Sequence, residues 1–158
     1  MKLTLAAIGR LSKGPEAELC AKMAARVDAF ARVTRLGPID LKAIEPKAAD
    51  RGPHGEAVLL RRAVAECDRL AAFDERGQAL SSSAFASNLE RWRDGGAARL
   101  GLVIGGADGL DPALRGEADL VISFGAMTWP HALARVMALE QIYRAATILA
   151  GHPYHREG

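Results

Sequence analysis

Residues 99–106 read RLGLVIGG, and this stretch decides the fold class of the chain. The run is almost continuously apolar, which is typical of a central strand in a parallel sheet, because such a strand is buried on both faces. Residues 119–124, DLVISF, form a second buried run of the same kind. Together the two runs predict a mostly parallel sheet flanked by helices.

The rest of the chain alternates between strand and helix patterns. Such alternation, without repeats or a low-complexity linker, predicts a single α/β domain over residues 1–158. The segments that read as strands are 2–8, 31–41 with a break at Gly37-Pro38, 70–74, 99–106 and 119–124. The helical patterns cover 14–30, 55–70, a segment from the N-caps Ser81–Ser83 to Gly95, a segment after Asp111-Pro112, and 130–150. Residues 45–55 are typical of a loop, and residues 75–78 are typical of a turn.

The composition is that of a soluble globular protein, with 49% hydrophobic and 25% charged residues. No apolar run approaches the roughly 18 residues that a membrane span needs, and the opening stretch MKLTLAAIG is too short and too strand-like for a signal peptide. We therefore expect a cytoplasmic protein with no membrane partner. Cys20 and Cys67 are isolated in helical patterns, so we expect them to be buried, reduced thiols.

Charge is unevenly distributed along the chain, whose formal net charge is +2. Residues 1–62 contain 12 Lys and Arg against 7 Asp and Glu, whereas residues 63–158 contain 9 against 12. The basic first half fits an anionic partner and an ordinary solvated surface equally well.

The last helical pattern, over residues 130–149, is apolar around more of its circumference than a helix covering a sheet requires, which is an arc of about 100°. The excess favours burial against a second copy of the chain, and the alternative is an unusually well-buried helix in a monomer. The main stripe contains Ala132, Val136, Leu139, Tyr143 and Ala146, and Leu133, Met137 and Ile148 widen it.

Three loops follow the carboxyl ends of predicted strands, where ligands bind in open α/β sheets. They are FDERGQALSS from Phe73, VIGGADGL at 103–110 and SFGAMTWPH at 123–131. Their glycines allow close backbone approach, which suits an adenine edge and a ribose better than a triphosphate. The chain has neither a Walker A sequence nor GxGxxG, and purely structural turns are the alternative interpretation of these glycines.

Four longer segments, in this order and spacing, carry a resemblance to a known family. They are FDERGQALSSSAFA from Phe73, LVIGGADGL, SFGAMTWPHALARVMALEQIYRA and ILAGHPYHRE, which ends at Glu157. They closely resemble the RlmH family, the large-subunit ribosomal RNA pseudouridine N3-methyltransferases of the SPOUT superfamily. The likeness is looser over the first 70 residues. Phe73 stands where leucine is commoner, and Ala126 where lysine is often found.

The resemblance implies a compact SPOUT fold with a deep C-terminal trefoil knot. It implies S-adenosylmethionine as the cofactor, a homodimer with the knots at its interface, and a target pseudouridine in large-subunit (23S) rRNA on the assembled ribosome, with no role for DNA. The cofactor contacts that it implies fall on Phe73, Gly106, Gly125, Ala126, Met127, Thr128, Trp129 and Pro130.

The C-terminal HPYHRE contains groups that suit methylation of an imide nitrogen, which must lose its proton to become nucleophilic. Tyr154 can stack on the target base, His155 can accept its N3 proton because imidazole titrates near neutral pH, and Arg156 can hold a phosphate or the developing anion. We expect this tail to order on binding, in its own pocket or in that of a partner subunit.

Interpretations other than catalysis remain open for the histidines and for Trp129. His152 and His155 could form half of a zinc site, but no cysteine lies near them and we expect no metal. His131 reads as a polar residue in the first turn of a helix, and Trp129 as packing around the pocket. Two alternative functions are a non-catalytic ribosome-binding module and an adenine-nucleotide sensor that uses the glycine loops.

Overall fold

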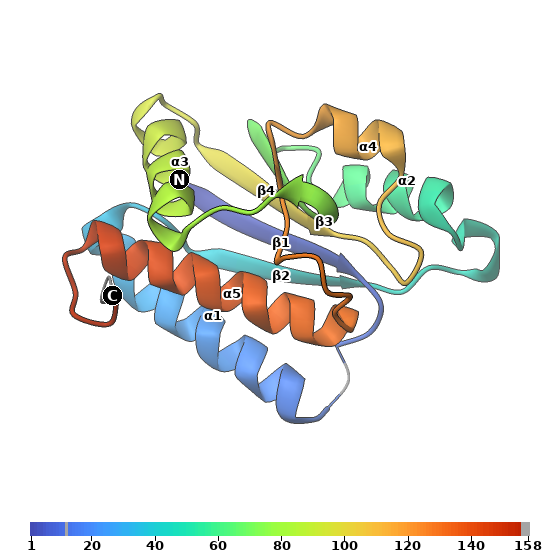
Figure 1. Cartoon of the computed structure of the whole chain (residues 1–158), viewed down its shortest axis with the longest axis horizontal. Helices are drawn as coiled ribbons and strands as arrows, with labels where there is room; N and C mark the ends of the chain where they lie inside the picture. The colour runs from blue at the N-terminus through green and yellow to red at the C-terminus, as the bar shows by residue number, and fades with distance from the viewer. Residues whose placement is uncertain (12, 156–158) are drawn as a thin grey trace.

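The computed structural model describes residues 1–11 and 13–155. Its centre is a sheet of five strands in the order β2-β1-β4-β3-β5, and all four neighbouring pairs are parallel (Figure 1). This confirms the α/β class and the parallel sheet expected from the sequence. The strands are β1 (Lys2–Ile8), β2 (Ile39–Ile44), β3 (Arg69–Gln78), β4 (Arg99–Ile104) and β5 (Leu120–Ile122).

The stretch that decides the fold class forms β4, the middle strand of the sheet. Leu100, Leu102 and Val103 are fully buried there. Val103 lies opposite Ala6 of β1 on one side and Ala72 of β3 on the other. The near-continuous apolar run is therefore explained by neighbours on both edges and helices on both faces.

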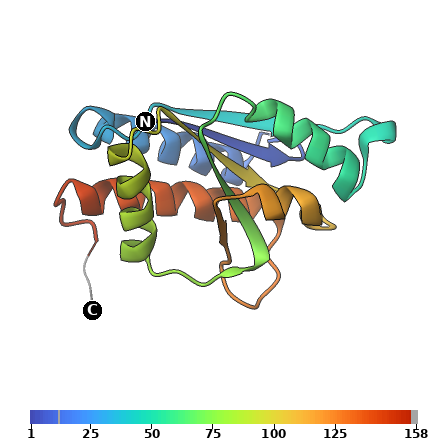
Figure 2. The same cartoon turned by 90° about the horizontal axis from the view of Figure 1, so that it is seen from above.

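Helices cover both faces of the sheet, as Figure 2 shows from above. Leu3, Leu5 and Ala7 of β1 pack in the larger core, with residues of α1, α3 and α5. Ala6 and Ile8 point to the opposite face and pack with residues of α2 and α4. The helices are α1 (Pro15–Thr34), α2 (Pro53–Ala63), α3 (Ser82–Asp94), α4 (Pro112–Glu117) and α5 (His131–Leu149), with a short 3₁₀ helix at Ala48–Asp50.

The predicted helix starts at Ser81 and Asp111 are confirmed by their capping hydrogen bonds. The side chain of Ser81 accepts a hydrogen bond from the amide of Ala84, and that of Asp111 accepts from the amides of Ala113 and Leu114. Both helices therefore begin where a side-chain oxygen satisfies amides that have no partner within the helix.

Two segment boundaries differ from the sequence expectation. Residues 31–34 continue α1 instead of beginning a strand, because Thr34 remains on the buried face and donates its hydroxyl hydrogen to the carbonyl of Phe30. The strand begins only at Ile39, after the turn at Gly37-Pro38. At the other end of this region, α2 covers 53–63 and does not reach residue 70.

Residues 75–78 are the third difference, because they extend β3 where a turn was expected. Gln78 pairs with Ile122 of β5 after a register shift that begins at Phe73, and its carbonyl accepts a hydrogen bond from the amide of Ser123. Pairing with a distant strand overrides the turn propensity of this glycine-containing segment.

Gly77 marks the place where the ends of β3 and β5 touch. A β-carbon at Gly77 would lie 2.6 Å from the backbone nitrogen and carbonyl carbon of Ile122, closer than real β-carbons approach other atoms. Main chain would have to move to accommodate it, because the obstacle is backbone and not a flexible side chain. Gly77 is therefore required by close contact between two strands and not by an unusual backbone angle.

Gly77→Ala should lower the free energy of unfolding by about 1–3 kcal/mol, the usual cost of overpacking a rigid site. The matched control is Gly116→Ala, at a helical position with no atom within 4 Å of the added β-carbon. That change should raise stability by about 0.5–1 kcal/mol through helix propensity. Urea unfolding, followed by circular dichroism, measures the free energy of unfolding of both variants. The same change in this free energy for both substitutions would contradict the close contact at Gly77.

Candidate functional site

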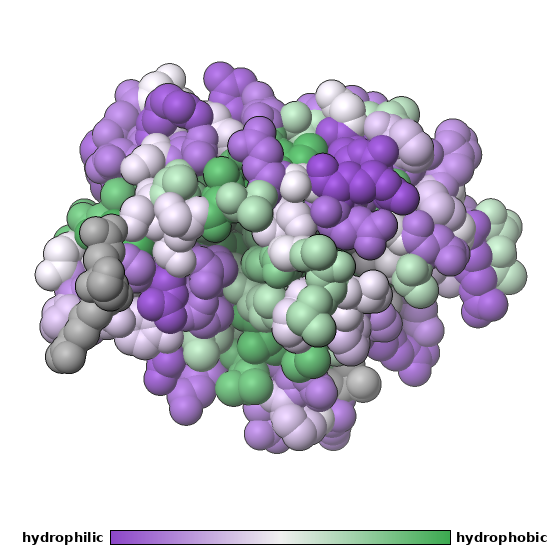
Figure 3. All heavy atoms as spheres, viewed as in Figure 1, coloured by the Kyte–Doolittle hydropathy of each residue, from purple (hydrophilic) through white to green (hydrophobic). Residues whose placement is uncertain are grey.

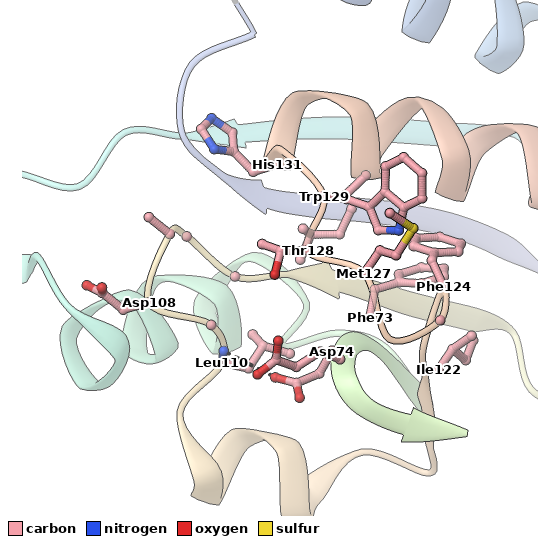
Figure 4. A pocket seen from close by; sticks show the side chains of 18 residues that line it. Phe73, Asp74, Asp108, Leu110, Ile122, Phe124, Met127, Thr128, Trp129 and His131 are labelled. Carbon is pink, nitrogen blue, oxygen red and sulfur yellow. Dashed lines mark hydrogen bonds between the residues drawn. The ribbon is translucent and has the colours of Figure 1, made fainter. Parts of the chain in front are cut away.

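The three loops that were expected to form one pocket do converge on a single cavity of about 250 Å³ (Figure 4). The end of β3 contributes Phe73, the loop after β4 contributes Gly106, and the loop after β5 contributes its central residues. Six of the eight positions expected to hold a cofactor line the cavity: Phe73, Gly106, Gly125, Met127, Thr128 and Trp129. The other two, Ala126 and Pro130, belong to the same loop without lining the cavity.

The loop after β4 folds into a tight turn closed by glycines. The amide of Gly109 donates to the carbonyl of Gly106 at 3.1 Å, and Gly109 has a φ of +79°. A β-carbon at Gly106 would meet the carboxylate of Glu56 at 2.7 Å. Glu56, on α2, therefore lies next to the loop although it does not line the cavity, a neighbour that no sequence pattern revealed.

Asp74 connects two of the three loops, and the sequence analysis did not single it out. Its side chain is only 2% exposed, and its Oδ2 faces the amide of Leu110, across the cavity floor, at 3.4 Å. Its Oδ1 accepts a hydrogen bond from the amide of Arg76, and the guanidinium groups of Arg76 and Arg115 lie 3.8 and 3.6 Å away. A carboxylate directly after a buried strand is the sequence signal that could have identified it.

The loop after β5 is held by its own first residues and by a buried arginine. The Ser123 hydroxyl and the main chain of Gly125 are joined by hydrogen bonds at 3.1 Å. Arg135, 3% exposed on α5, donates to the carbonyls of Ile8 and Gly9 at the end of β1. Its burial lowers the pKa of the guanidinium. These contacts fix the first turns of α5, and hence the loop, against the sheet.

The cavity has an apolar side and an acidic side. Phe73 and Phe124 stack with ring centres 5.0 Å apart, and Figure 4 shows Met127 and Trp129 gathered with them. On the other side lie the carboxylates of Asp74, Glu75 and Asp108. Among the described residues that line the cavity there is no lysine or arginine. This lining suits a ligand that combines a flat aromatic group with positive charge.

The C-terminal tail packs on the far part of α5. The Tyr154 hydroxyl donates to a Glu140 carboxylate oxygen at 3.1 Å, and the Arg144 guanidinium lies over the Tyr154 ring at 4.9 Å. Nη1 of Arg144 is also 3.5 Å from Nδ1 of His155. Burial, followed by the negative charge of Glu140, raises the pKa of Tyr154. Arg156, the third residue assigned to the reaction, lies outside the described residues.

Cavity and tail lie at different parts of the same helix. His131 begins α5 and lines the cavity, whereas Glu140, which holds Tyr154, comes nine residues later. At a rise of about 1.5 Å per residue, this separates the two by roughly 13 Å along the axis. Figure 1 shows the described segment after α5 beyond the end of the helix that is remote from the loop after β5. In this arrangement, Tyr154 and His155, the described residues of the tail, therefore do not reach the cavity of their own chain.

The remaining sequence expectations have mixed outcomes. His131 is in the first turn of α5, as expected, but Trp129 is 41% exposed and not simply packed around the cavity. Both cysteines are free, Cys20 buried and Cys67 half-buried, and burial raises the pKa of each thiol. In the described part of the chain, no helix is long and apolar enough to cross a bilayer, and no cluster of potential metal ligands is found.

Comparison with known proteins places the chain among methyltransferases. A family model described as a predicted SPOUT methyltransferase matches residues 1–155. The chain is 53% identical to the ribosomal RNA large subunit methyltransferase H of Ruegeria pomeroyi over 156 residues, which is 99% of each protein. It is also 53% identical to the protein of the same name from Paracoccus denitrificans, covering 99% of this chain and 100% of the relative.

Solved structures support the fold at much lower sequence identity. A probable methyltransferase from Bordetella pertussis matches with a TM-score of 0.55 and 16% identity, over 92% of this chain and 96% of that one. A probable methylase family protein from Haemophilus influenzae matches with a TM-score of 0.57 and 10% identity, over 98% of this chain and 70% of that one. At these identities the likeness concerns the fold alone.

Glu140→Gln should lower the pKa of Tyr154, because it removes the negative charge that opposes ionisation of the phenol. With its pKa raised, the phenol keeps its hydrogen bond to Glu140 at low and neutral pH and loses it as the pH rises through that pKa. Absorbance titration in a Tyr143→Phe background follows Tyr154 alone, since the chain has two tyrosines. Glu90→Gln, on α3, is the charge-matched control, and an equal response to both changes would contradict the contact.

Proposed function

The chain belongs to the SPOUT methyltransferase family, and from this membership we propose that it methylates N3 of a pseudouridine in large-subunit (23S) ribosomal RNA, using S-adenosylmethionine. The observation that carries the proposal is the convergence of three strand-end loops on one aromatic and acidic cavity, in a chain that matches its relatives over its whole length. The substrate is the assembled ribosome, and the enzyme acts in the cytoplasm.

The lining of the cavity fits S-adenosylmethionine, which carries a flat adenine and two positive charges, on its sulfonium and its ammonium group. The aromatic side, with Phe73 and Phe124, suits the adenine, and the carboxylates suit the cationic groups. Main-chain groups near Gly106 and from Gly125 to Pro130 would hold the adenine and ribose edges. When bound, this cofactor supplies an electrophilic methyl group.

The residues of the tail would prepare the nucleophile. His155 takes the N3 proton of pseudouridine, Arg156 stabilises the imide anion, and Tyr154 orients the base. The deprotonated N3 would then be the nucleophile for the methyl group that the bound cofactor supplies, with the sulfonium sulfur as the leaving group. The cavity walls exclude water and hold the reacting atoms in line, which is where positioning contributes most to rate.

The separation of cavity and tail supports a shared active site in a homodimer. The tail lies on the far part of α5, so a partner subunit is the simplest source of a tail for each cavity. The α5 stripe is only partly covered within one chain: Leu139 and Tyr143 are buried, but Leu133 is 39% exposed. A symmetric contact through residues 130–149 would bury this surface twice. We also infer the deep C-terminal trefoil knot, on the ground of family membership.

Gly106→Val should abolish binding of S-adenosylmethionine measured by calorimetry, while circular dichroism remains native. The β-carbon alone would lie 2.7 Å from the Glu56 carboxylate, which would have to move away, and the branched side chain would obstruct the close approach of the ligand to the loop. Gly116→Val, at an open position on α4, should bind as tightly as the unmodified protein. An unchanged affinity in Gly106→Val would place the cofactor elsewhere.

Removal of residues 154–158 should leave the melting temperature within a few degrees and the cofactor affinity intact. It should reduce methylation of ribosomes that lack the modification by at least ~100-fold, the low end of what one acid–base group contributes. His155→Ala should lower the rate and change its pH dependence. Normal methylation by the shortened chain would exclude any chemical role for the tail.

A further inference from the structure

Three apolar side chains are exposed together at the mouth of the cavity and on the first turn of α5. Met127, Trp129 and Leu133 are 72%, 41% and 39% exposed, and we call them the mouth cluster. In Figure 3, hydrophobic surface runs through the middle of the face where Figure 1 places the loop after β5. Met127 and Trp129 also line the cavity, whereas Leu133 does not. A ligand in the cavity can therefore reach two of the three.

The Trp129 side chain is only partly covered by the rest of the chain, because the residue is 41% exposed. The chain has two tryptophans, and Trp92 packs against the main core. Within the described residues, the ring contacts pair Phe30, Phe73, Phe124 and the tyrosines, and Trp129 takes part in none of them. A large aromatic ring that stays partly exposed beside a cavity points to a partner that stacks on it.

We propose that the Trp129 ring stacks on the nucleobase presented for methylation, with Met127 beside it. This inference rests on the proposed function. Enzymes that modify a base take it out of its helix and hold it between aromatic or apolar side chains. Phe73 and Phe124 already stack on each other inside the cavity, so Trp129 offers a separate aromatic face at the entrance. Its backbone contacts the cofactor while its side chain takes the base.

The position of Trp129 favours a base over a second copy of the chain as the occupant. The dimer contact inferred above involves α5 and therefore includes Leu133 of the mouth cluster, whereas Trp129 precedes the helix and lines the cavity. A base stacked there has its edge directed into the cavity, where the methyl group would be held. Stacking also suits a cavity whose described lining contains no lysine or arginine to bind phosphate.

Trp129→Ala should reduce kcat/KM for unmodified ribosomes by about 5- to 150-fold, the range expected for loss of one base–aromatic stack. Trp129→Phe should restore most of the activity. The affinity for S-adenosylmethionine and the sedimentation coefficient should not change in either variant. An unchanged kcat/KM, or a dimer that dissociates in Trp129→Ala, would overturn the inference.

A fluorescence experiment distinguishes the base from the cofactor. In Trp92→Phe, Trp129 is the sole tryptophan, and this variant should retain full activity because Trp92 lies in the core, away from the cavity. Uridine monophosphate added to the protein saturated with S-adenosylhomocysteine should quench Trp129. The inference would be overturned if S-adenosylhomocysteine alone quenched the Trp129 fluorescence completely, or if the nucleotide caused no further quenching.

The proposed function fails separately from this inference. If the protein without substitutions neither binds S-adenosylmethionine nor methylates ribosomes, the proposed function is wrong. If it does both and Trp129→Ala behaves identically, only the assignment of the stacking residue is wrong.

Discussion

The contact between Gly77 and the backbone of Ile122 sets the position of every loop at the candidate site. With no room for a β-carbon between them, the end of β3 and the end of β5 lie in direct contact. The hydrogen bond from Ser123 to Gln78 continues the pairing on the far side of the register shift. Phe73 and the loop after β5 consequently open on the same space, and the glycine turn after β4 closes it.

Helix α5 separates the cavity from the tail residues Tyr154 and His155. Its first residue lines the cavity, and its later turns carry Glu140 and Arg144, which hold Tyr154. A helix keeps its length, so the distance between its ends cannot shrink to bring tail and cavity together. Arg135 also holds the start of α5 at the end of β1, through hydrogen bonds to the carbonyls of Ile8 and Gly9. This separation is the reason for which we propose a site shared by two subunits.

The fold was predictable because its signals are local and strong. The apolar run at 99–106 could hardly be anything but a central strand, and the N-caps Ser81 and Asp111 mark helix starts by chemistry alone. The loops followed from the rule that ligands bind at the carboxyl ends of parallel strands. The extension of β3 through 75–78 was missed because it depends on pairing with residues more than forty positions away.

The parts of the site that the sequence did not reveal depend on long-range contacts. Asp74 and Glu56 matter because of what lies opposite them, the Leu110 amide and Gly106, and neither neighbour is close in sequence. The exposure of Trp129 could not be read from its residue type, which more often indicates packing. The resemblance to the RlmH family identified the tail residues, but only the structure shows Tyr154 and His155 held far along α5.

The central claim is that the cavity of one chain works with the tail of another, and subunit mixing tests it most directly. A chain without residues 154–158 keeps its cavity, and a Gly106→Val chain keeps its tail, so each alone should be inactive. After equal amounts of the two chains exchange subunits, random pairing should make about half of the dimers mixed, and each mixed dimer has one complete site out of two. The mixture should therefore recover about a quarter of the activity of the protein without substitutions. A mixture that forms such mixed dimers yet remains inactive would contradict a shared site.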